Sequence, residues 1–64
     1  MCLSSVYSEQ DGKRTLLMSK AAGLESDPDG IICRDFLGRT IRISGKISSI
    51  DLENNIIVCK LEDK

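Results

Sequence analysis

The sequence predicts an all-β protein, a small sheet curled on itself or closed into a barrel, with about five to seven short antiparallel strands. Three observations lead to this prediction. β-Branched residues dominate the second half of the chain, turn signals interrupt it at short intervals, and no segment shows a sustained helical period. Short strands at such spacing are typical of small barrels and sandwiches. The 64 residues suffice for a single domain, over residues 1–64.

The amino-terminal half is predicted to begin with a hairpin. A first strand over 2–8 is followed by Asp11-Gly12, a strong two-residue turn signal, and by a return strand over 14–18. Residues 19–30 contain two glycines and the only proline, without a sustained period. We therefore interpret them as a connection, in which the composition allows one short strand near Leu24.

The carboxyl-terminal half is predicted to be extended over 31–36, 40–44, 46–51 and 56–61. Ile41 and Ile43 alternate with polar residues, which is the period of a half-buried strand. Gly45 interrupts a longer extended run, as expected of a bulge or of a bend where a sheet curls over itself. Turns are predicted at 37–39 and 53–55.

Alternation along these strands predicts the core. The residues expected to face inward are Ile31, Cys33, Ile41, Ile43, Ile57, Cys59 and Leu61. Free cysteine behaves as a small buried hydrophobe, so Cys33 and Cys59 are interpreted as core residues. The opposite face carries Ile32, Ile56 and Val58, which is more aliphatic surface than a comfortable monomer exposes. Together with the short chain, this predicts a homodimer with those three residues at its interface.

Composition excludes several classes of function. Nine basic and ten acidic residues give a net charge of −1, and the only aromatic residues are Tyr7 and Phe36; both features weigh against a nucleic-acid partner. The absence of histidine removes the commonest general base and the Ser-His and Cys-His nucleophiles, so no enzyme activity is expected. No apolar run approaches the roughly 20 residues that span a bilayer, and no signal-peptide pattern is present. These features predict a cytoplasmic protein without membrane contact.

Cys2 is the candidate metal ligand. The three cysteines lack Cys-x-x-Cys spacing, which argues against a disulfide scaffold and against a standard structural zinc site. A small residue at position 2 permits removal of Met1, after which the amine nitrogen and the thiolate sulfur of Cys2 can close a five-membered ring around a metal ion. This ligand pair suits Ni(II), Cu or Zn. The alternative interpretation is that Cys2 is a small apolar residue at the start of an edge strand.

Several short elements follow one another over nearly the whole length of the chain. They are Met1-Cys2-Leu3, Val6-Tyr7, Asp11-Gly12-Lys13, Leu24-Glu25, Asp29-Gly30-Ile31, Phe36-Leu37-Gly38, Ile41, Ile47, Ile50-Asp51-Leu52 and Ile57-Val58. No single element is specific, but in this order and spacing the chain resembles the small nickel-binding proteins of the CooT family. That family is also catalogued as predicted RNA-binding proteins.

The resemblance implies a homodimeric nickel carrier. In that family, nickel is bound through the amino-terminal cysteine, and the proteins are linked to loading the nickel-iron-sulfur site of carbon monoxide dehydrogenase. Carried over, Cys2 is the only residue that matches the metal position, with the backbone nitrogen of Leu3 as an alternative donor. Two chains would supply two sulfurs and two nitrogens, a square-planar set that satisfies nickel. The resemblance thus implies one Ni(II) per dimer, with carbon monoxide dehydrogenase or another nickel-maturation protein as the partner.

Three alternatives stay open. The first is a small RNA-binding barrel, favoured by the family's older label and by a stretch of basic residues: Arg34, Arg39, Arg42 and Lys46. The second is a maturation factor of the HypC type, which also begins Met-Cys and escorts iron, although this chain lacks the proline- and glycine-rich opening of those proteins. In the third, the chain is an interaction domain and Cys2 is incidental.

Overall fold

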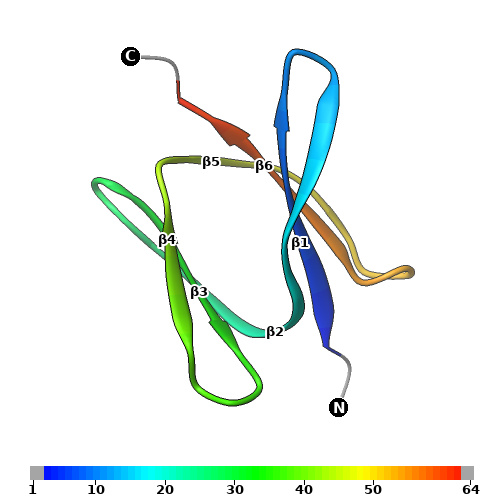
Figure 1. The fold of residues 1–64 in the computed structure, drawn as a ribbon, viewed down its shortest axis with the longest axis vertical. Coiled ribbons are helices and arrows are strands. Elements are labelled where there is room, and N and C mark those ends of the chain that lie inside the picture. The colour runs from blue at the N-terminus through cyan, green and yellow to red at the C-terminus, as the bar shows by residue number, and fades with distance from the viewer. Residues whose placement is uncertain (1–2, 63–64) are drawn as a thin grey trace.

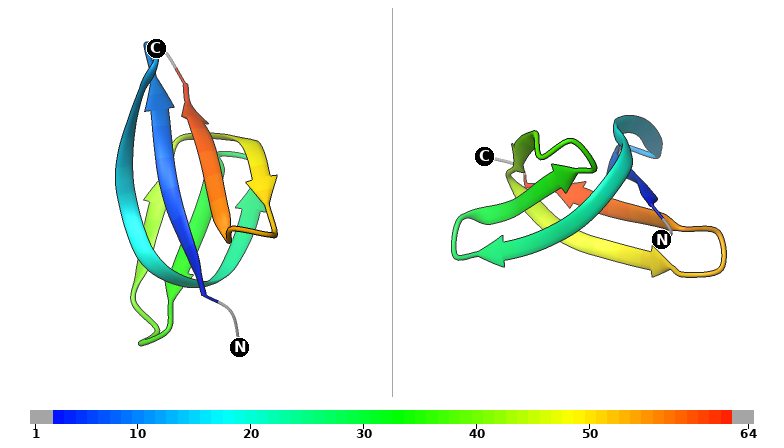
Figure 2. Two further views of the ribbon diagram at one scale, coloured as in Figure 1. Left: turned by 90° about the vertical axis from the view of Figure 1, so that its right-hand side faces the viewer. Right: turned by 90° about the horizontal axis from the view of Figure 1, so that it is seen from below.

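The computed structural model describes residues 3–62, which form a single six-stranded sheet (Figure 1). The strands are β1 (Ser4–Gln10), β2 (Lys13–Asp27), β3 (Gly30–Asp35), β4 (Thr40–Ile43), β5 (Gly45–Asp51) and β6 (Ile56–Leu61). Their order in the sheet is β4-β3-β2-β1-β6-β5. The sheet curls into a half-barrel, so that its two edge strands, β4 and β5, are joined through Ser44 alone (Figure 2). The predicted all-β curled sheet is confirmed, and residues 3–62 contain no helix that could span a membrane.

One strand pairing differs from the prediction of a purely antiparallel sheet. β1 and β6 run parallel, with Val6 beside Ile57 and Ser8 beside Cys59. A parallel pair needs a long crossover between its two strands, and here β2 to β5 supply it. Alternation in the sequence shows which face of a strand is buried but carries no information about strand direction. The sheet is therefore mixed.

The predicted connection over 19–30 is mostly strand. β2 continues to Asp27, so that its first part pairs with β1 and its second part pairs with β3. Both ladders are irregular between Met18 and Gly23, which lets the strand bend from one partner to the next. Only Pro28 and Asp29 remain as a turn. The prediction of a connection over 19–30 is thus wrong for most of its length, which is a bent part of one long strand.

The core lies inside the curl. Its buried members are Val6, Met18, Ala21, Ile31, Cys33, Ile43 and Cys59, against which Leu17, Leu24, Ile41, Ile57 and Leu61 pack. All seven residues predicted to face inward are confirmed. The predicted interface residue Val58 is only 1% exposed within the single chain, because β6 is an interior strand and Val58 lies between Tyr7 and Ser49 of its neighbours. Val58 is therefore not available to a second chain.

Two glycines lie where the backbones of neighbouring strands come close, Gly45 of β5 against β6 and Gly30 of β3 against β4. A Cβ at Gly45 would collide with the carbonyl oxygen of Lys60, and one at Gly30, where φ is 154°, would collide with that of Ile43. Both obstacles are backbone atoms, which cannot move aside as a flexible side chain can. The predicted bend at Gly45 is confirmed, and its cause is the close approach of β5 to the end of β6.

Candidate metal centre

Two of the three cysteines belong to the core. Cys33 on β3 and Cys59 on β6 are free thiols with 0% exposure. Burial raises the pKa of both thiols, and the neighbouring Cys59 raises that of Cys33 further, to about 11. A metal ligand must be the thiolate. With no exposed surface, neither thiol can be reached by an ion from solvent while the core is closed, which leaves Cys2 as the candidate sulfur donor.

The predicted ligand Cys2 lies outside the described residues, which begin with Leu3 just before β1. Leu3 is half-buried and precedes the strand. Ser4 pairs with Ala21 of β2, and the backbone N–H of Ser5 donates to the carbonyl oxygen of Asn55 at 2.8 Å. The paired register begins at Ser4, so a deprotonated backbone nitrogen at Leu3 would disturb none of these strand pairs.

The end of the half-barrel where β1 starts carries exposed apolar side chains on both sides. Across the sheet, Ala21 pairs with Asp35 on one side of β1, and Ile56 pairs with Asp51 on the other. Phe36 and Leu37 follow Asp35 in the chain and are 51% and 63% exposed. Leu52 follows Asp51 and is 81% exposed. Seen from below, the start of β1 lies between the β3–β4 turn and the β5–β6 turn (Figure 2).

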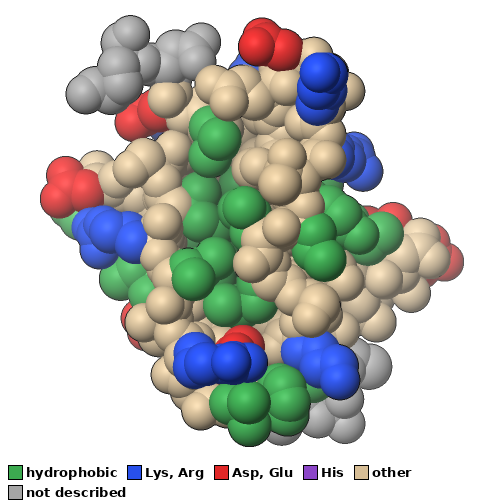
Figure 3. All heavy atoms as spheres, viewed as in Figure 1, with side chains coloured by type: hydrophobic (Ala, Val, Ile, Leu, Met, Phe, Trp, Pro, Cys, Tyr) green, Lys and Arg blue, Asp and Glu red, His purple; other side chains and the backbone are tan. Residues whose placement is uncertain are grey.

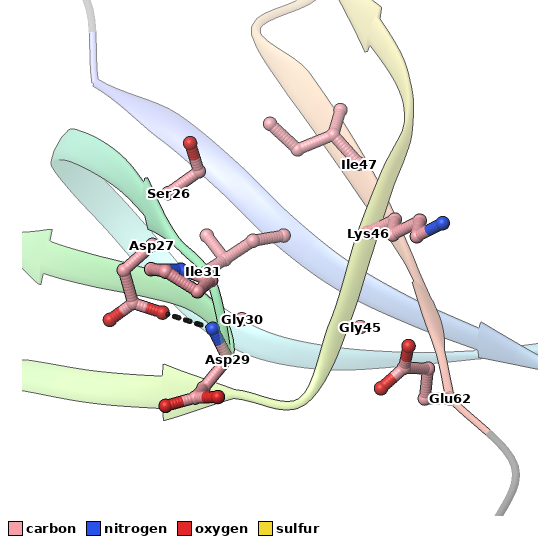
Figure 4. Close-up of a pocket in the computed structure, with 10 residues that line it drawn as sticks. Ser26, Asp27, Asp29, Gly30, Ile31, Gly45, Lys46, Ile47 and Glu62 are labelled. Atoms are coloured by element: carbon pink, nitrogen blue, oxygen red, sulfur yellow. Dashed lines mark hydrogen bonds between the residues drawn. The ribbon is translucent and has the colours of Figure 1, made fainter.

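Residues 3–62 contain no group of three or more histidine, cysteine, aspartate or glutamate side chains that could hold a metal ion. An acidic cavity of about 240 Å³ lies at the opposite corner of the curl and is lined by Asp27, Asp29, Lys46 and Glu62 among others (Figure 4). Partial burial opposes ionisation of Asp27, but hydrogen bonds from the Asp29 N–H (2.9 Å) and from Arg42 (2.8 Å) outweigh it and lower the pKa of Asp27. That carboxylate is already engaged.

The four basic residues of the RNA hypothesis lie on different elements: Arg34 on β3, Arg39 in the β3–β4 turn, Arg42 on β4 and Lys46 on β5. Two of them are paired with carboxylates. Arg39 Nε is 2.9 Å from Asp35, and the Arg42 guanidinium is 2.8 Å from Asp27. These pairs weaken the electrostatic basis for RNA binding.

A family model described as CO dehydrogenase accessory protein CooT matches residues 1–60. The chain belongs to the CooT family. Membership confirms the resemblance found in the sequence, and an accessory protein of this kind is a maturation factor rather than a catalyst. The fold is similar to that of a crystal structure of a candidate CooT from Carboxydothermus hydrogenoformans, with a TM-score of 0.88 over 97% of this chain and 100% of that chain at 22% identity. A comparison with curated proteins gave no match.

Asp35 fixes the conformation of the β3–β4 turn beside the chain start. One carboxylate oxygen accepts the N–H groups of Leu37 and Arg39, each at 2.9 Å, and the other accepts Arg39 Nε at 2.9 Å. Burial alone would raise the pKa of Asp35, but these hydrogen bonds and the Arg39 charge lower it below the ordinary 3.8. The carboxylate form therefore stabilises the turn.

Substitution Asp35→Asn is expected to lower the melting temperature at pH 6 and to matter less in acid. The pKa of Asp35 is lower in the folded state than in the unfolded state. Its contribution to the stability of the fold is therefore complete above the ordinary pKa of 3.8 and is lost as the pH falls through the folded-state pKa. Thermal melts of both proteins between pH 6 and pH 2.5 would measure this. The matched control Asp51→Asn removes a similar but exposed cap and should cost less. A difference between wild type and Asp35→Asn that stays constant with pH would contradict this role.

The thiols are expected to differ sharply in reactivity. At pH 8 the native protein should react rapidly with Ellman's reagent at one thiol, Cys2, whereas Cys33 and Cys59 react only after unfolding in guanidinium, because they are buried and protonated. Absorbance of the released thionitrobenzoate counts the thiols. Cys2→Ser should remove the rapid phase, and rapid reaction of three thiols in the native protein would show that the core is open.

Proposed function

We propose that this protein is a cytoplasmic Ni(II) carrier in the maturation of carbon monoxide dehydrogenase, in which Cys2 residues of two chains hold the ion as cargo. The observation that carries the proposal is the burial of Cys33 and Cys59, whose thiols stay protonated near neutral pH. The described residues offer no competing donor cluster. Membership in a family of CO dehydrogenase accessory proteins supports the choice of recipient.

The donor set requires two chains. One Cys2 supplies one sulfur, with its own amine or the Leu3 backbone nitrogen beside it, which fills only half of a four-coordinate site. Two chains supply two sulfurs and two nitrogens, and a square-planar arrangement of these suits Ni(II) better than tetrahedral Zn(II). Exposed apolar side chains beside the start of β1 support association of two chains at this end.

Carriage rather than catalysis suits a site at a chain end. Donors on an end of the chain can be replaced one at a time by ligands of a receiving protein, so that the ion is never released into water. The proposed recipient is carbon monoxide dehydrogenase or another nickel-maturation protein.

A nickel titration tests the proposal. Protein whose amino terminus has been established by intact mass is titrated with Ni(II), and absorption in the thiolate charge-transfer region is followed. We expect saturation at one nickel per two chains. One tightly held nickel per isolated monomer, or an absence of thiolate absorption, would contradict a shared Cys2 site.

A further inference from the structure

We propose that two chains dock reciprocally, the β3–β4 turn of each chain on the β5–β6 turn of the other, so that the starts of the two β1 strands lie between them. The proposal rests on the proposed function for its need of two chains. It goes further by naming the surface, which replaces the Ile32, Ile56 and Val58 face predicted from alternation. The two turns are called the basic turn (35–39, with Lys20 and Arg34 beside it) and the acidic turn (51–55).

The basic turn presents apolar side chains within a positive rim. The Lys20 ammonium lies 5.5 Å from the centre of the Phe36 ring, and the Arg34 guanidinium lies across Gly23, where a Cβ would collide with it. With Arg39 these make three cations, against one carboxylate, the buried Asp35. Figure 3 shows hydrophobic side chains between two basic patches at the end where this turn lies.

The acidic turn has the opposite charge and a similar construction. Asp51 accepts the N–H groups of Glu53 and Asn54, each at 3.1 Å, and the Asn54 side-chain amide at 2.9 Å. These bonds fix a turn whose most exposed apolar residue is Leu52, and whose two charged residues, Asp51 and Glu53, are both acidic. Each turn is thus held in shape by an aspartate and needs no reordering to bind.

Charge decides which surfaces can meet. Two basic turns facing each other, or two acidic turns, would place like charges together. A two-fold axis through the region between the turns, where β1 begins, instead brings each basic turn against the partner's acidic turn. Such an interface is isologous, as a two-fold dimer requires. The same operation brings the starts of the two β1 strands to the axis.

The test measures dimer dissociation of the full chain by sedimentation equilibrium, without metal and in EDTA. Lys20→Glu and Glu53→Lys are each expected to weaken the dimer by roughly tenfold at low salt, and Leu52→Ser by about thirtyfold. The double variant with both charge reversals should return to within about threefold of wild type. Lys46→Glu and Leu16→Ser are the matched controls, because Leu16 is as exposed as Phe36 (51%) but lies on the far part of β2.

Mixing the two single variants gives the sharpest readout. In a mixed dimer, the reversed basic turn of one chain faces the reversed acidic turn of the other, and the second contact is that of wild type. Native mass spectrometry with one variant labelled with ¹⁵N should therefore show mixed dimers in excess over both homodimers. Circular dichroism verifies that every variant is folded.

Several outcomes would overturn reciprocal docking: a wild type that stays monomeric, single reversals without effect, or a double variant weaker than either single. Single reversals without effect would point to contact between like turns, in which each reversal only exchanges one like-charge pair for another. The nickel titration is independent of these results. One nickel per two chains with unaffected charge variants would reject the docking surface alone, whereas a reciprocal dimer that binds no nickel would reject the proposed function alone.

Discussion

Substitution Cys2→Ser is expected to remove tight nickel binding, with a loss of affinity of more than about 100-fold. Replacing even a group that only orients a metal ligand costs roughly 10- to 100-fold, and this substitution removes a ligand itself. In a shared site it removes both sulfurs at once, because each chain supplies one. A hydroxyl stays protonated near neutral pH and is a poor ligand for nickel. Isothermal titration with Ni(II), together with the thiolate charge-transfer absorption, measures the loss.

A matched control separates loss of the ligand from loss of a thiol. Cys59→Ala removes a sulfur that is buried in the core, so it should lower stability and leave the nickel affinity and the stoichiometry unchanged. If Cys2→Ser binds nickel as wild type does, the metal site lies elsewhere and the proposed function fails. The interaction-domain interpretation, in which Cys2 is incidental, would then be favoured.

Local pattern was sufficient to predict the carboxyl-terminal half of the fold. Ile41 and Ile43 face the core as their alternation predicts, and they pair with Cys33 and Ile31 in register. Gly45 marks the bend because β5 must pass close to the backbone of Lys60. The strand pairs of Ile41 and Ile43 join residues that are near one another in the sequence. At position 45, the glycine is itself a sign that the backbone has no room for a side chain.

The amino-terminal half was predicted less well because its strand contacts are decided by distant partners. The second part of β2 is polar and contains Gly23, which reads as a break. It is extended because Leu24 pairs with Cys33 and Ser26 with Ile31, and tertiary pairing overrides weak local propensity. The parallel pairing of β1 with β6 joins Val6 to Ile57, some fifty residues apart, and no local signal encodes such a pairing.

The candidate site, too, could be predicted only in part from the sequence. The chemistry of a thiol at position 2 could be found in the sequence, and so could the core assignment of Cys33 and Cys59. The surroundings of the chain start could not, because Phe36 and Leu52 are brought to either side of β1 only by the strand order. The opposite charges of the basic turn and the acidic turn suggest a docking surface only once the strand order places both turns at the same end of the sheet.

Nickel is expected to stabilise the dimer. A ligand that binds only the folded dimer stabilises it by mass action, by about 2.7 kcal/mol at a free concentration 100 times Kd. For two chains of this size that corresponds to a rise in melting temperature of roughly 10 °C. Because the ion bridges both chains, it should also hold the dimer together at lower protein concentrations, and so extend the dependence of the melting temperature on protein concentration into a range where the chains without nickel are dissociated.

Thermal melts with and without Ni(II), at protein concentrations spanning two decades, measure both effects. Cys2→Ser serves as the control and should show neither. Zn(II) should produce a smaller shift, because it prefers a tetrahedral set to a square-planar one. A shift that appears without any change in concentration dependence would mean that one chain binds the ion by itself. The two-chain donor set would then be wrong even though Cys2 remained a ligand, since only a shared ion links metal binding to association.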